Sequence, residues 1–130
     1  MTEEEKELLL IDLCARLPYN VFCEISDADE PYKLETIRFN GEYFLFNNGV
    51  FEKYITEIKP YLRPMSSMTD EEKKVYKTIS AWGYVLESRG HRTGIYPTIE
   101  GYKWLNANYF DYHHLIEKGL ALPAPKGMYN

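Results

Sequence analysis

Two Asn-Gly pairs, Asn40-Gly41 and Asn48-Gly49, constrain the fold of this 130-residue chain more than any other feature. An Asn-Gly pair is the strongest short-range signal for a β-hairpin, because both central residues of a type I′ turn need a positive φ. The two pairs separate three runs rich in aromatic and β-branched residues, 32–39, 42–47 and 50–58. A further run of this kind, 21–25, precedes them. The sequence therefore predicts about four strands in an antiparallel meander or a small SH3-like barrel.

The third of these runs has no polar face. Tyr43-Phe44-Leu45-Phe46 is apolar or aromatic at every position, so we expect both faces of this strand to be covered. Aromatic residues make up 15% of the chain and include 12 tyrosines. Part of this aromatic content is therefore expected in the core, and the rest is available for a binding surface.

A helix is predicted at the start of the chain, and Pro18 ends it. Thr2 and Glu5 have the spacing of a capping box. An apolar stripe follows at positions i, i+3, i+4 and i+7, formed by Leu10, Leu13, Cys14 and Leu17. We expect Cys14 to be a small buried hydrophobic residue of this stripe.

Residues 59–68 are predicted to form an extended connector, because Pro60 and Pro64 disfavour a helix at the residues that precede them. A second capping box, Thr69 with Glu72, then begins a long helix. Apolar residues at helical spacing form one face of this helix: Val75, Ile79, Trp82 and Leu86. The helix is expected to end near Arg89-Gly90.

Two shorter helices are predicted near the end of the chain. Thr98 can cap the first of them, whose core-facing residues are expected to be Ile99, Tyr102, Leu105 and Tyr109. Asp111 can cap the second, over 112–118, and Gly119 suits the left-handed position after it.

The predicted fold is α+β and comprises one domain, residues 1–130. It divides into a helix with an antiparallel sheet over 1–58, a Pro-rich connector over 59–68, and a helical half over 69–130 packed on the sheet. A chain of this length can bury enough surface to fold without a metal or a disulfide. No cofactor is expected.

The charge distribution narrows the classes of partner. Residues 1–60 carry 13 acidic and 6 basic side chains, and residues 61–130 carry 7 acidic and 9 basic ones. An acidic protein is a poor match for a phosphate backbone, so nucleic acid is an unfavoured partner. The acidic N-terminus is unlike a signal peptide, no apolar run could span a bilayer, and no CxxC motif occurs. These features favour a cytoplasmic protein with reduced thiols and no membrane partner.

Three segments resemble a group of small bacterial proteins encoded in genomes and prophages of gut Bacteroides and their relatives. The resemblance implies a bacterial or phage-borne origin, and it brings no activity with it. The group often has Arg-Gly where this chain has His113-His114, so no role of that arginine is carried over. The segments that carry the resemblance are 13–19, 59–69 and 104–121.

The common catalytic and phosphate-binding motifs are absent from the sequence. It contains no P-loop, no GxSxG and no HExxH. His113 and His114 are adjacent, so on a helix their side chains would point about 100° apart and could not share one metal ion. We therefore expect neither an enzyme nor a metal site.

The sequence favours an accessory protein that acts by binding another protein, because it is rich in aromatic residues and lacks a catalytic constellation. Two alternatives remain: a weak nucleic-acid binder that uses a local basic patch, and a small-molecule binder with a pocket in the sheet. The expected oligomeric state is a monomer or a weak homodimer. The candidate interaction residues all lie in the second half: Tyr61, Arg63, Arg89, His91, Arg92, Tyr109, Tyr112 and His113.

Overall fold

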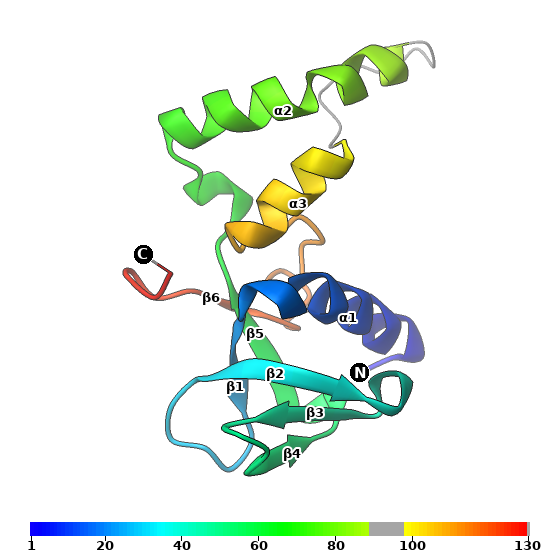
Figure 1. Ribbon diagram of the computed structural model, residues 1–130, viewed down its shortest axis with the longest axis vertical. Coiled ribbons are helices and arrows are strands. Elements are labelled where there is room, and N and C mark those ends of the chain that lie inside the picture. The colour runs from blue at the N-terminus through cyan, green and yellow to red at the C-terminus, as the bar shows by residue number, and fades with distance from the viewer. Residues whose placement is uncertain (89–97, 130) are drawn as a thin grey trace.

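The computed structural model describes residues 1–88 and 98–129, with the backbone alone for residues 40 and 80–88. This part of the chain contains helices and strands that confirm the α+β class (Figure 1). In chain order the elements are α1 (Glu3–Arg16), β1 (Phe22–Ile25), β2 (Tyr32–Arg38), β3 (Tyr43–Phe46), β4 (Phe51–Lys53), β5 (Ile58–Leu62), α2 (Asp70–Ser88), α3 (Ile99–Ala107) and β6 (Leu122–Pro123).

The strands form a six-stranded sheet in the order β4-β3-β2-β1-β5-β6. All pairs are antiparallel except β5 and β6, which run parallel. The predicted meander corresponds to β2, β3 and β4. The prediction of a connector over 59–68 is wrong for its first residues, because they belong to β5, which pairs with β1. Ile58, Pro60 and Leu62 are buried in alternation, which is the period of a strand.

The two Asn-Gly pairs form different turns. Asn48 and Gly49 both have a positive φ, 56° and 82°, as the type I′ prediction requires. The other pair lies in a 3-10 turn, Phe39–Gly41, in which Phe39 and Gly41 have the positive φ values. This turn packs against α1, since a Cβ on Gly41 would come within 2.5 Å of Leu10.

Helix α1 has the predicted capping box: the backbone N–H of Glu5 donates to the Thr2 hydroxyl at 3.1 Å. Its buried face coincides with the predicted stripe only in part, since Leu13 is buried and Leu10 and Leu17 pack against the core half-buried. The fully buried residues are Leu9, Asp12, Leu13 and Arg16, whereas Cys14 is exposed. Asp12 and Arg16 form an ion pair and lie on the buried side together with Leu9 and Leu13.

The main core lies between α1 and one face of the sheet. Phe44 and Phe46 of β3 point into it, but Tyr43 and Leu45 of the same strand are half-exposed on the opposite face. The expectation that both faces of this strand are covered is therefore wrong. A second, smaller core of Met68, Leu105 and Phe110 lies beneath the helices of the second half.

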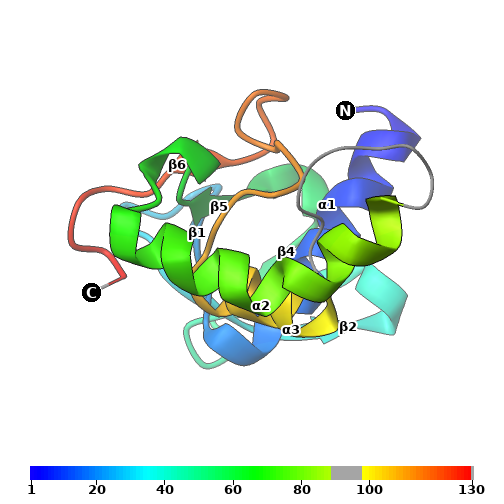
Figure 2. The ribbon, with the colours of Figure 1, turned by 90° about the horizontal axis from the view of Figure 1, so that it is seen from above.

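Helices α2 and α3 contact each other at the end of the molecule opposite β3 and β4 (Figures 1 and 2). Both predicted caps are present, Thr69 with Glu72 and Thr98 with Gly101. Leu105 is buried as expected, but Ile99 and Tyr102 face solvent. No helix in the described ranges is both long enough and apolar enough to cross a membrane.

The predicted helix over 112–118 is a series of turns. Its predicted cap is nevertheless present, because the Asp111 carboxylate accepts from the backbone N–H groups of Leu115 and Ile116 at 2.8 and 3.0 Å. Gly119 has φ 73°, and Leu120 N–H donates to the Leu115 carbonyl. These bonds pair backbone groups without forming a helix, and among the described residues of the second half the α-helices are α2 and α3.

Candidate functional site

The predicted interaction residues of the connector are held by contacts within the chain. The Arg63 guanidinium forms two hydrogen bonds to the Glu72 carboxylate, at 2.7 and 2.9 Å, and lies 4.1 Å from the centre of the Phe110 ring. The Arg63 hydrogen bonds lower the pKa of Glu72 to about 2. Tyr61 is half-buried, and its backbone carbonyl accepts from the Tyr129 hydroxyl.

Tyr109 and Tyr112 are also half-buried and bonded within the chain. The Tyr109 ring stacks on Tyr129 with 3.6 Å between centroids, and its hydroxyl donates to the Tyr19 carbonyl. The Tyr112 hydroxyl donates to the side chain of Asn106 at 2.9 Å. The Tyr109 contact joins parts of the chain that are distant in sequence, whereas the Tyr112 contact is local, and packing within the chain accounts for the position of both rings.

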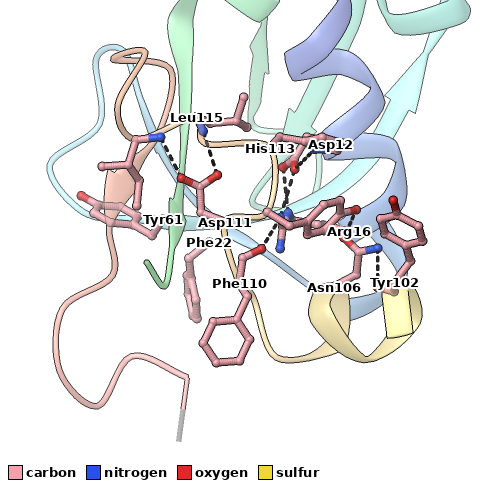
Figure 3. A network of polar contacts seen from close by, with 12 residues as sticks. Asp12, Arg16, Phe22, Tyr61, Tyr102, Asn106, Phe110, Asp111, His113 and Leu115 are labelled. Carbon is pink, nitrogen blue, oxygen red and sulfur yellow. Dashed lines mark hydrogen bonds and ion pairs between the residues drawn. The ribbon is translucent and has the colours of Figure 1, made fainter. Parts of the chain in front are cut away.

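His113 belongs to a buried polar network with α1 (Figure 3). Its Nδ1 lies 2.8 Å from Oδ1 of Asp12, and the Arg16 Nε and Nη2 donate to the same carboxylate at 2.7 and 3.0 Å. Arg16 Nη2 also donates to the Phe110 carbonyl at 2.6 Å. The network therefore ties α1 to the segment that follows α3.

The Asp12 carboxylate titrates below its ordinary range. Burial on its own raises the pKa of this group, but the hydrogen bonds from His113 and Arg16 outweigh burial and lower it. Asp12 is therefore the ionised partner of a buried Arg16. Such a pair is a structural element in the first instance, because removing either partner leaves an uncompensated buried charge.

Arg89, His91 and Arg92, the remaining predicted interaction residues, lie outside the described residues. Within residues 1–88 and 98–129, no group of three or more His, Cys, Asp or Glu side chains could hold a metal ion. Cys23 is fully buried, and burial raises the pKa of its thiol. A raised pKa disfavours the thiolate, which is the nucleophilic form of cysteine.

Tyr129 fills a gap between two strands. Its hydroxyl accepts from the backbone N–H of Phe22 in β1 at 2.9 Å and donates to the carbonyl of Tyr61 in β5 at 2.8 Å. It lies directly beyond the last β1–β5 pair, Cys23 with Pro60. One side chain near the C-terminus therefore satisfies a backbone donor and a backbone acceptor.

Replacing Tyr129 with Phe is expected to lower the free energy of unfolding by about 1–3 kcal/mol, because both backbone groups lose their partner in a half-buried site. Urea unfolding followed by circular dichroism measures the change. Tyr102→Phe, at an exposed position, is the matched control and is expected to leave the free energy nearly unchanged. Equal stability of the two variants would contradict this role of the hydroxyl.

Three aromatic rings gather on the outer face of the sheet, at the end of the β3–β4 hairpin where the first Asn-Gly pair lies. Phe39 packs edge-on against Tyr43 with 5.7 Å between centroids, and Tyr43 packs against Tyr54 at 5.3 Å. The Arg38 guanidinium lies 5.1 Å from the Phe39 ring centre. Phe39 is 64% exposed and Tyr54 is 53% exposed. We call these four residues the aromatic patch.

Sequence reasoning placed the exposed aromatic residues in the second half and missed the aromatic patch. The alternation of side chains along a strand could have indicated the aromatic patch, because successive residues point to opposite faces. Arg38 and Tyr43 pair with each other on the face opposite Phe44 and Phe46. The aromatic run 43–46 concealed this alternation, because its outward positions are apolar too.

Phe39 has an unusual backbone conformation, with φ 54°. Bulky residues seldom adopt a left-handed conformation, which Gly and Asn tolerate better. The turn thus holds a large apolar side chain in solvent at a position that favours a small or polar one.

The chain matches no protein-family model, no curated protein and no solved structure.

Proposed function

We propose that this protein is a non-enzymatic accessory protein that binds another protein through the aromatic patch. The observation that carries the proposal is Phe39, which is 64% exposed and has a left-handed backbone. Bulky residues in sparsely populated backbone conformations cluster at functional sites, where the local cost is offset by function. Tyrosine and arginine, which complete the patch, are enriched in the residues that dominate protein interfaces.

The setting of the patch suits binding. Tyr43 is part of β3, which pairs with β2 on one side and β4 on the other. The inner face of β3 is anchored by Phe44 and Phe46 in the main core. Rings held on a rigid strand lose little conformational freedom when a partner covers them.

The predicted residues of the second half support binding less well. A partner that used Arg63 would have to compete with Glu72, and one that used Tyr109 would have to break its contacts with Tyr129 and Tyr19. Arg63 also bears on the alternative function, nucleic-acid binding through a local basic patch. Its ion pair with Glu72 reduces the positive charge that it offers to a phosphate.

Phe39→Asn is expected to separate stability from binding. Asparagine tolerates the left-handed conformation, so the free energy of unfolding should be unchanged or rise by up to about 1 kcal/mol. Binding should fall, because the variant removes the most exposed ring of the patch. The measurement compares the proteins that immobilised wild type and variant capture from a gut Bacteroides lysate, together with urea unfolding of both.

Val50→Asn is the matched control for this experiment. Val50 is 70% exposed and lies at the other end of the same hairpin, away from the patch. The proposal requires a protein that wild type and Val50→Asn capture equally and that Phe39→Asn does not capture. Identical capture by all three chains would refute it.

A further inference from the structure

The aromatic patch is bordered by acidic side chains. Glu42 is exposed and precedes Tyr43, and Glu52 of β4 lies opposite Leu45, on the same outer face as Tyr43. A hydrogen bond to Tyr54 is the main cause that raises the pKa of Tyr43, and the carboxylates of Glu42 and Glu52 raise it further. By strand register Glu52 shares the outer face with Tyr43, and Glu42 is the neighbour of Tyr43 in the chain.

The segment of the chain that forms β1 to β4 is acidic. Residues 20–58 carry 8 acidic and 3 basic side chains, whereas residues 59–130 carry 7 acidic and 10 basic ones. One of the three cations, Lys53, is buried and forms ion pairs with Asp27 and Glu57 at 3.5 and 3.9 Å. Lys33 and Arg38 therefore remain as the exposed cations of this region, and Arg38 is itself part of the patch.

An aromatic ring already accepts a cation within the patch. The Arg38 guanidinium lies 5.1 Å from the centre of the Phe39 ring, within the distance of a cation–π contact. Exposed tyrosine and phenylalanine rings attract cations by the negative charge of their faces, and carboxylates beside them add to that attraction. Arginine is the best match, because its planar guanidinium can stack on a ring and also bond a carboxylate.

We infer that the aromatic patch, with Glu42 and Glu52 beside it, binds a basic, arginine-containing segment of a partner protein. This inference rests on the proposed function and specifies the chemistry of the partner. The guanidinium groups of the segment stack on the rings of Phe39, Tyr43 and Tyr54 and form ion pairs with the two carboxylates. The net negative charge of residues 20–58 attracts such a segment before contact.

Three synthetic nonapeptides test the inference: alternating Arg-Ser, Gln-Ser and Glu-Ser. Binding of each to the full chain is measured by isothermal titration calorimetry at about 50 mM and about 500 mM salt, because salt screens exposed charges. We expect only the Arg-Ser peptide to bind, and to bind less tightly at high salt. Phe39→Asn should abolish binding, and the double variant Glu42→Gln/Glu52→Gln should weaken it by about fivefold.

The matched control removes the same charge elsewhere. Glu71→Gln/Glu100→Gln changes two exposed acidic residues of α2 and α3, at the far end of the molecule from the patch (Figure 1). This control is expected to bind the Arg-Ser peptide as wild type does. Equal weakening by both double variants would show attraction by net charge alone and would overturn the assignment of the site.

Two other results would overturn the inference, and the first of them would leave the proposed function in place. In the first, the Arg-Ser peptide binds no better than the Gln-Ser peptide, while capture from lysate still depends on Phe39. In the second, sedimentation shows that wild type is a dimer and that Phe39→Asn is a monomer, which would make a second copy of this chain the occupant. Loss of Phe39-dependent capture would instead refute the proposed function itself.

Discussion

Replacing Asp12 with Ala is expected to lower the free energy of unfolding by about 3–5 kcal/mol, the cost of breaking a buried ion pair. The Asp12 carboxylate is the only charged partner of the buried Arg16 guanidinium among the described residues. The variant leaves that guanidinium in the core without a countercharge, and Arg16 Nη1 already has no hydrogen-bond partner within the described chain. Urea unfolding followed by circular dichroism measures the loss.

The double variant Asp12→Leu/Arg16→Met is the control for this prediction. Replacing both partners by apolar residues removes the uncompensated charge, so the double variant should be more stable than Asp12→Ala by several kcal/mol. It also removes the Arg16 hydrogen bond to the Phe110 carbonyl, so some loss relative to wild type is expected. Additive effects of the single variants Asp12→Leu and Arg16→Met would contradict the coupling expected of this ion pair.

The same pair makes the protein sensitive to acid. The pKa of Asp12 is lower in the folded state, so its contribution to stability is complete above the pKa of an unfolded Asp, about 3.9. This contribution is lost as the pH falls through the folded pKa. Wild type should therefore lose more stability than the double variant below about pH 4. Glu72, with a pKa of about 2, contributes to acid sensitivity in wild type and in the double variant alike. Its contribution therefore cancels when the stabilities of the two proteins are compared.

Phe110→Ala is the second change with a large expected effect, about 3–5 kcal/mol for removing a buried phenylalanine. The Phe110 ring is fully buried, stacks on Trp104 with 5.6 Å between centroids and lies beneath the Arg63 guanidinium. Residue 110 is also bridged to Arg63 through the backbone. The variant removes the ring of the smaller core against which Tyr76 of α2 and Trp104 of α3 pack.

Tryptophan fluorescence can detect where this loss occurs, because both tryptophans belong to α2 and α3. In Phe110→Ala, the fluorescence transition in urea should precede the circular dichroism transition, since the helices lose their packing before the sheet unfolds. Phe110→Leu keeps most of the apolar volume and should cost much less. Coincident transitions with a loss below about 1 kcal/mol would show that Phe110 is not central to the smaller core.

The local elements were predictable because their signals span only a few residues. Thr2 with Glu5 and Thr69 with Glu72 form capping boxes in the structure, and Asn48-Gly49 forms the predicted turn. Helix boundaries and hairpin turns follow from such short-range bonds and backbone preferences. The same reasoning could not identify the exposed rings, because exposure depends on which face of a strand another element covers.

By itself, the sequence determined the α+β class, the start of each helix and the tight hairpin at Asn48-Gly49. Only the tertiary structure decided which side of α1 is buried, where β5 and β6 join the sheet, and which aromatic rings face solvent. Arg16 meets Phe110 and Tyr129 meets Phe22 across some 90 to 110 residues of chain. Local backbone preferences carry no information about such contacts, because the contacts form only when the elements pack together.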